Sequence, residues 1–350
     1  MLSETIFLSP LESAGFALAA LLCYPFGRLA GVPGFFARIL VGVCLAALPA
    51  AVMANISAGL IRPYILCSLA IGTLLWIWII RQKLQTGQPL VEGASPFALA
   101  GAVAILIIAA GLNYPNHSVF ETGSDGQLYY LYSDHYSYYS AQSNEMLNAN
   151  YYSRLRVMNY YPRPWSSYHL YNAAVLAQLQ AFVVTPRVLT YIGSQLLLIV
   201  LVLAALAELA LSFQGAKWEL TLRLLCWIFL AATFFYKGIQ WTLFTTGTVA
   251  VFSVVYFVSA VFRQRSYGEL CLLLLLTGLA SFRYLLIVAP VLIWLGARLL
   301  YDLRFQPQSP RLRANGPPAW LLAAAGVFFL YYNIATVEQP QLRGLAALIH

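Results

Sequence analysis

Residues 129–140, YYLYSDHYSYYS, hold the side chains of this chain that are best suited to chemistry. Asp134 and His135 stand side by side, with six tyrosines around them. A carboxylate can take the proton of an acceptor hydroxyl or amine as that group attacks, so Asp134 is a candidate general base. Asp is also a favoured N-cap, and Asp134 could cap a helix that starts near Tyr136. The two roles do not exclude each other.

His135 and the acidic residues near this stretch have two interpretations each. His135 is either a hydrogen-bond partner or metal ligand, with Asp134 and Glu145 as its companions around a divalent cation, or a packed side chain. The simpler interpretation of Asp125, in GSDGQ, is a turn residue, and that of Glu121 is a charged side chain in water. Each of these two acids also stays a candidate for the reactive carboxylate.

The composition indicates a membrane protein. Hydrophobic residues make up 61% of the 350 and charged residues 9%, against about 25% charged in a soluble chain. Several apolar runs reach the roughly 20 residues that a bilayer-crossing helix needs. The net charge of +8 does not indicate nucleic-acid binding, because most basic residues lie at the ends of apolar runs and do not form a cluster on one face. The five cysteines lie in apolar runs without paired spacing, which favours buried side chains over metal ligands or disulfides.

The apolar runs predict an all-α polytopic membrane protein of about ten transmembrane helices. The predicted spans are residues 12–30, 35–55, 61–80, 96–113, 188–212, 218–236, 239–262, 268–281, 284–301 and 319–336. With the N-terminus outside, eleven Lys and Arg fall in cytoplasmic turns and three in short outer turns, as the positive-inside rule requires. No cleavable signal peptide is expected, because the first twelve residues carry two acids and no base.

This orientation divides the chain into three parts in a plasma membrane, such as a bacterial inner membrane. Residues 1–113 form four spans, residues 114–187 form an extracytoplasmic loop of catalytic type, and residues 188–350 form about six spans. The loop contains thirteen of the twenty-three tyrosines. It is predicted to carry two helices that lie on the membrane surface, 137–148 and 167–182, because each mixes apolar and polar residues over several turns.

The segment 267–302 is long for one helix and short for two. Both of its flanks are basic, RQR before and GARLLYDLR after, so both ends should be cytoplasmic. We therefore expect a helical hairpin whose outer tip is SFRY, residues 281–284. The alternative is a single kinked helix that would bury Arg283 in the membrane.

The tyrosines and three cations on the outer side are candidates for substrate binding. Tyr138 and Tyr139 contact a sugar or lipid, or else belong to an interfacial aromatic belt. Arg163 in the PRPW bend, Lys237 and Arg283 all map to the outer side. They can bind the phosphate of a donor or anchor lipid headgroups.

Two quoted stretches resemble a known family. DHYSYYSAQSNEMLNANYYSR, followed by YYPRPWSSYHLYNAAVLAQL, resembles the outer loop of GT-C membrane glycosyltransferases, in the branch of the protein O-mannosyltransferases and lipid A aminoarabinose transferases. That loop has an acidic pair, a Tyr, EML, a short turn, a Pro-containing stretch and an aromatic-rich helix. His135 stands where the family has the second acid.

The resemblance implies an enzyme that uses a polyprenyl-phosphate-linked hexosyl or pentosyl donor, with inversion at the sugar carbon. Asp134 would activate an acceptor of unknown identity. Arg163 and Arg283 would bind the donor phosphate, and Glu145 and His169 would lie on the substrate-binding loop. Membrane lipids are the other expected partners, and nucleic acid is not one.

Two other classes of function compete. A transporter or flippase of a lipid-linked or sugar substrate would use an ionisable residue inside a span, and Glu208 is the deepest candidate. A non-catalytic membrane assembly protein is the third interpretation.

Overall fold

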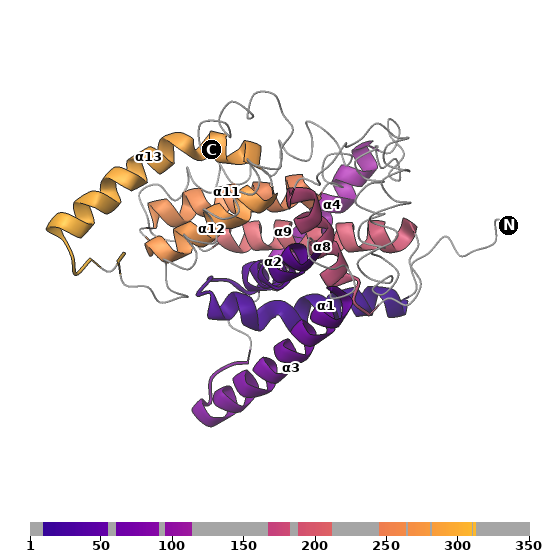
Figure 1. Ribbon diagram of the computed structural model, residues 1–350. Helices are drawn as coiled ribbons and strands as arrows, with labels where there is room; N and C mark the ends of the chain where they lie inside the picture. The colour runs from indigo at the N-terminus through magenta and orange to yellow at the C-terminus, as the bar shows by residue number, and fades with distance from the viewer. Residues whose placement is uncertain are drawn as a thin grey trace.

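The computed structural model describes residues 10–54, 61–90, 95–113, 167–182, 188–211, 245–263, 265–280, 282–309 and 311–312. Every regular element in these ranges is a helix, which confirms the all-α class for this part of the chain. The helices, shown in Figure 1, are α1 (Pro10–Leu29), α2 (Phe35–Ala54), α3 (Ile61–Thr86), α4 (Pro96–Asn113), α8 (Ser167–Leu179), α9 (Val188–Leu211), α11 (Thr245–Phe262), α12 (Tyr267–Ala280) and α13 (Phe282–Phe305).

Eight of the ten predicted spans coincide with helices. The predicted spans 218–236 and 319–336 lie outside the described residues. The largest differences in length are at the C-terminal ends of α3 and α13, which continue to Thr86 and Phe305 with polar and basic residues. Apolar runs therefore predicted where the helices form, and charged residues did not end them.

Local capping explains where several helices begin. Ser95 precedes α4, and its hydroxyl accepts a hydrogen bond from the Ala98 N–H at 3.3 Å, with Pro96 as the first helical residue. Ser266 caps α12 in the same way through the N–H of Glu269 at 3.3 Å. Between α1 and α2 the chain turns at Gly34, whose φ of 90° is a left-handed conformation that favours glycine.

Side-chain contacts bring three of the predicted cytoplasmic turns to one end of the bundle. Glu208, in the last turn of α9, accepts a hydrogen bond from the Phe36 N–H at the start of α2, at 2.9 Å. Tyr256, near the end of α11, donates its hydroxyl to the carbonyl of Pro33 at 2.8 Å. The ends of α9 and α11 therefore meet the turn between α1 and α2, as the predicted alternation of helix direction requires.

The segment 267–302 is described as two helices, α12, which ends at Ala280, and α13, which begins at Phe282. The first residue of α12, Tyr267, donates its hydroxyl to Asp302 Oδ2 near the end of α13, at 2.8 Å. The start of α12 and the end of α13 therefore lie together, so these two helices run in opposite directions. The predicted pair of antiparallel helices is confirmed and the single kinked helix is wrong, whereas the outward position of the tip stays a prediction.

The helix predicted at 167–182 forms as α8, but its predicted position on a surface is wrong. Its side chains from Ala174 to Gln180 are all buried, and Tyr171 donates its hydroxyl to the Cys44 carbonyl of α2 at 3.1 Å. In Figure 1 this helix lies among α1, α2 and α9 at the centre of the bundle. A helix that is buried on all sides belongs to a core.

Two polar side chains, one in the last turn of α8 and one directly after the helix, explain how it can be buried. Gln178 donates to the Ser68 hydroxyl of α3 at 2.9 Å, and Gln180 donates to the Ser194 hydroxyl of α9 at 2.9 Å. A buried amide without a partner would destabilise the fold, but these two have partners on neighbouring helices. The mixed polar and apolar sequence of this helix therefore reflects internal hydrogen bonds.

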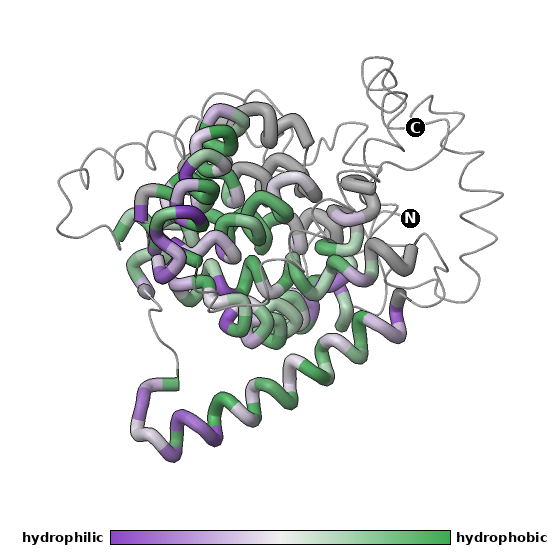
Figure 2. Tube along the Cα trace, turned by 60° about the vertical axis from the view of Figure 1, so that its left-hand side comes forward, coloured by the Kyte–Doolittle hydropathy of each residue, from purple (hydrophilic) through white to green (hydrophobic). Residues whose placement is uncertain are grey.

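Four described helices, α1, α3, α4 and α13, expose large apolar side chains to the outside of the bundle. On α3 the exposed side chains include Ile71, Leu74, Ile77 and Trp78, and α4 and α13 expose similar ones. Figure 2 shows α3 along the lower edge of the molecule, with hydrophobic middle turns and hydrophilic residues near both ends. The outward faces of these helices are thus apolar, which is unusual for a protein surface in water.

By length and composition, one described segment is able to cross a bilayer: Arg62–Thr86 within α3, in which 28% of an apolar stretch of 18 residues is buried. Shorter apolar segments occur in four other described helices: Phe35–Ala50, Leu196–Leu211, Phe252–Val261 and Tyr267–Gly278.

Candidate functional site

Most predicted site residues lie outside the described part of the chain. These are Asp125, Asp134, His135, Tyr138, Tyr139, Glu145, Arg163 and Lys237. His169 is in the first turn of α8 and Arg283 in the first turn of α13, where only the helical backbone is described. The meeting of Asp134 with Arg163 and Arg283 therefore stays a prediction.

The predicted divalent cation site, with His135 among its ligands, also lies outside the described residues. Within the described residues there is no group of three or more His, Cys, Asp or Glu side chains that could hold a metal ion. Of the cysteines in this part, Cys23 and Cys44 are buried as predicted, whereas Cys67 is exposed.

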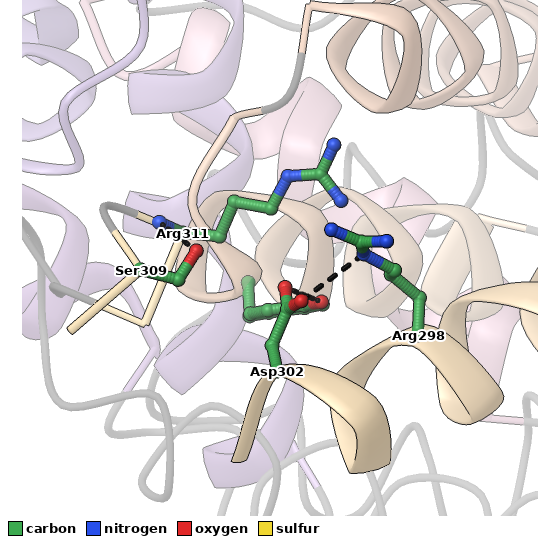
Figure 3. Close-up of polar contacts among 5 residues, drawn as sticks. Arg298, Asp302, Ser309 and Arg311 are labelled. Carbon is green, nitrogen blue, oxygen red and sulfur yellow. Dashed lines mark hydrogen bonds and ion pairs between the residues drawn. The ribbon is translucent and has the colours of Figure 1, made fainter. Parts of the chain in front are cut away.

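The described part of the chain has a polar network at the C-terminal end of α13, which we call the two-arginine site. It consists of Arg298, Asp302, Arg311 and Tyr267, and Figure 3 shows the first three of them together with Ser309. Arg298 Nε lies 3.1 Å from Asp302 Oδ1, and the two residues are four apart on the helix. The Asp302 side chain is fully buried, whereas that of Arg298 is 37% exposed. The N–H of Arg298 is not aligned with the carboxylate oxygen, so the contact is an ion pair without a well-directed hydrogen bond.

Tyr267 and Ser309 fix Arg311 in this network. The Tyr267 N–H donates to the carbonyl of Arg311 at 3.0 Å, and the Arg311 N–H contacts the Ser309 hydroxyl at 3.4 Å. Tyr267 precedes the predicted span 268–281. Its partial burial and then the adjacent Asp302 carboxylate raise the pKa of the Tyr267 hydroxyl. The hydroxyl is therefore protonated at neutral pH and donates to Asp302.

An apolar cavity of about 650 Å³ adjoins the two-arginine site between α11 and α13. Val258 and Val261 line it from α11, and Pro290, Val291 and Trp294 line it from α13. Arg298 and Arg311 supply the charged part of its wall. The site thus combines two guanidinium groups with an apolar groove, an arrangement that suits an anion with an apolar body.

The sequence places Arg298 and Arg311 only in a predicted basic cytoplasmic flank. A signal for the ion pair was present, because Arg298 and Asp302 are spaced i,i+4 on an expected helix. No sequence signal could show that Tyr267 and Arg311 join them, since these contacts depend on how the hairpin closes.

Glu208 lies at the same end of the bundle and joins three helices. Its Oε2 accepts the hydrogen bond from Phe36 N–H, and the N–H groups of Phe35 and Ala37 at the start of α2 and of Ser95 before α4 lie nearby, while the other oxygen, Oε1, is buried without a hydrogen-bond partner in the described part of the chain. A carboxylate is favoured at helix N-termini because of their unpaired N–H groups and positive dipole ends. The Glu208 carboxylate therefore has a structural role as a shared cap.

We expect Glu208→Ala to lower the free energy of unfolding by about 1–3 kcal/mol, because buried N–H groups of α2 would lose their acceptor. Glu208→Gln keeps a carboxamide oxygen in the same place and should lower it less. Detergent-denaturation curves of the purified variants would measure both. Equal stability of the Ala variant and the unmodified chain would contradict the capping role.

The fold and the site thus define a helical protein with an apolar exterior and a two-arginine site at one end. Comparisons with protein-family models, curated proteins and solved structures find no match to this chain.

Proposed function

We propose that this chain is an integral multi-pass membrane protein with about ten transmembrane helices. The observation that supports this most strongly is the outward exposure of apolar side chains on α3, α4 and α13. A membrane protein gains nothing from burying such side chains, because lipid tails are equally apolar. The meeting of the predicted cytoplasmic turns at one end of the bundle agrees with the proposed orientation.

Within this membrane protein, we propose that residues 114–187 transfer a sugar from a polyprenyl-phosphate donor to an extracytoplasmic acceptor. Asp134 takes the proton of the acceptor hydroxyl or amine while the acceptor atom forms its bond to the sugar carbon. The bond from that carbon to the donor phosphate breaks, and polyprenyl phosphate leaves. The pattern from Asp134 to the aromatic-rich helix supports this proposal.

The burial of α8 adds a structural argument for the loop. The chain that leaves the predicted catalytic stretch enters α8, which is held in the core by Gln178 and Gln180. Sites carried on rigid elements are positioned more accurately than sites on free loops. The buried α8 would therefore anchor one end of the catalytic stretch against the bundle.

The transporter alternative has less support. Its best candidate, Glu208, uses its carboxylate to cap α2, and a residue with that role is poorly suited to bind and release a substrate. We therefore prefer the enzyme.

Labelling of single cysteines tests the orientation on which the enzyme depends. In a chain with its native cysteines replaced by Ser or Ala, we expect Ser140→Cys to react with a membrane-impermeant maleimide in intact cells. Gln306→Cys, at an exposed position beyond the end of α13, should react only after the membrane is permeabilised. Mass-shift gels would measure both reactions.

Reaction of both cysteines after denaturation is the control for their chemical access. Labelling of Ser140→Cys only after permeabilisation would place the catalytic stretch in the cytoplasm and overturn the proposed enzyme, because its carrier-linked donor would then be on the other side.

A further inference from the structure

The two-arginine site brings two like charges together. Figure 3 shows that the guanidinium groups of Arg298 and Arg311 point toward one another. Asp302 neutralises one of them, and its other oxygen already accepts the Tyr267 hydroxyl. Counting only the residues that the structure describes, one positive charge is therefore left over at the mouth of an apolar groove, and an anion between the guanidinium groups would balance it.

The chemistry of the two cations selects the kind of anion. Guanidinium groups are planar forks whose N–H pairs match the oxygens of phosphate or carboxylate. Arg298 is oriented through its Nε by the buried Asp302, and Arg311 through its backbone by Tyr267 and Ser309. The Asp302 carboxylate beside Arg298 and the backbone contacts of Arg311 hold these two residues in place, so only the end of the Arg311 side chain has to be ordered when a phosphate binds, which favours binding.

The walls of the groove select the rest of the ligand. The groove has apolar walls that include Val258, Val261 and Val291. Trp294, which also lines the groove, is 51% exposed. The adjacent Ile293 is 77% exposed, so this side of α13 faces the surroundings of the bundle. In the proposed membrane placement those surroundings are lipid tails, with Trp294 close to the interface where tryptophan is enriched.

We propose that the groove between α11 and α13 binds an anionic glycerophospholipid, with its phosphate between Arg298 and Arg311 and an acyl chain along the wall that includes Trp294. This inference rests on the proposed membrane placement and goes beyond the proposed sugar transfer. In the predicted orientation the site faces the cytoplasmic leaflet, whose surface is negatively charged. It is at the opposite end of the bundle from the predicted donor site.

The test is a lipid competition on the full chain purified in detergent. The protein is mixed with equal amounts of phosphatidylglycerol and phosphatidylcholine that have the same acyl chains, and bound lipids are counted by native mass spectrometry. We expect a preference for phosphatidylglycerol of about tenfold, the effect of one good charge-assisted contact. Arg311→Gln and Arg298→Gln should each bring that preference close to one.

Two further variants separate the site from general attraction and from misfolding. Arg304→Gln removes an exposed cation of the same helix end, whose guanidinium lies over Phe305 outside the groove, and should keep the preference. Arg298→Lys keeps a charge beside the buried Asp302, and should retain the fold and part of the preference. A preference that survives in Arg311→Gln, or that is lost equally in Arg304→Gln, would overturn the proposal.

Soluble competitors distinguish a lipid from a free phosphate. Inorganic phosphate and glycerol phosphate should not displace phosphatidylglycerol at the same concentration, because they lack the acyl chain that contacts the groove. Equal displacement by these ions would show a soluble phosphate site and overturn the lipid assignment. Asp134→Asn should keep the lipid preference, so a failure of the proposed sugar transfer would leave this result intact.

Discussion

Replacing Asp134 with Asn is expected to lower the rate of sugar transfer by about two to four orders of magnitude, the usual contribution of a general base. Asn has the size of Asp but cannot take the proton of the acceptor. The fold should be unaffected, because Asn is also a good N-cap and would keep any capping role of the position. Transfer from a polyprenyl-phosphate sugar in a membrane preparation measures the rate, and gel filtration checks the fold.

Two other carboxylate variants make this result specific. Glu338→Gln removes the same charge from the C-terminal segment on the same predicted side of the membrane, and should transfer sugar normally. Asp125→Asn tests the second candidate acid. Full activity in Asp134→Asn together with a large loss in Asp125→Asn would move the base to residue 125, and full activity in both would remove the proposed mechanism.

Gly42→Ala is expected to lower the free energy of unfolding by about 3 kcal/mol, at the upper end of what overpacking usually costs. A Cβ at Gly42 in α2 would collide with the backbone carbonyl of Cys23 in α1, and a Cβ at Gly27 in α1 would collide with the carbonyl of Arg38 in α2. The collisions are with backbone atoms, so a change of side-chain rotamer cannot relieve them. Close backbone approach through glycine is typical of helix packing in membranes.

The chain has well-matched controls for Gly42→Ala. A Cβ at Gly101 in α4 or at Gly296 in α13 would meet nothing within 4 Å. Ala favours a helix over Gly by up to about 1 kcal/mol, so Gly101→Ala and Gly296→Ala should leave the stability unchanged or raise it. Unfolding in increasing concentrations of SDS would measure all of these variants. A Gly42→Ala protein as stable as these two controls would show that α1 and α2 do not pack at the described distance.

The helices could be predicted from the sequence because an apolar run is a local property. A predominantly apolar sequence over the length of a helix predicted α9 and α11, and the basic residues on both flanks predicted the hairpin of α12 and α13. Both signals lie within a few turns of the elements they describe. The helices that these signals predict therefore form whatever the helices pack against.

The position of α8 could not be predicted in the same way. Its mixture of glutamines with Ala, Val and Leu suits a helix at an interface and suits equally a buried helix with internal hydrogen bonds. The two differ only in whether Gln178 and Gln180 find partners, and the partner of Gln178, Ser68, is 110 residues away. Hydropathy contains no information about such a partner.

The sequence by itself determined that the described part of this chain is helical, where its nine described helices lie and which pair of them forms a hairpin, because each of these depends on residues close together along the chain. Only the tertiary structure decided that α8 is a core helix, that Glu208 caps α2, and that Arg298 and Arg311 face a shared groove. Those properties depend on contacts between distant residues, and the geometry of such contacts is set by packing.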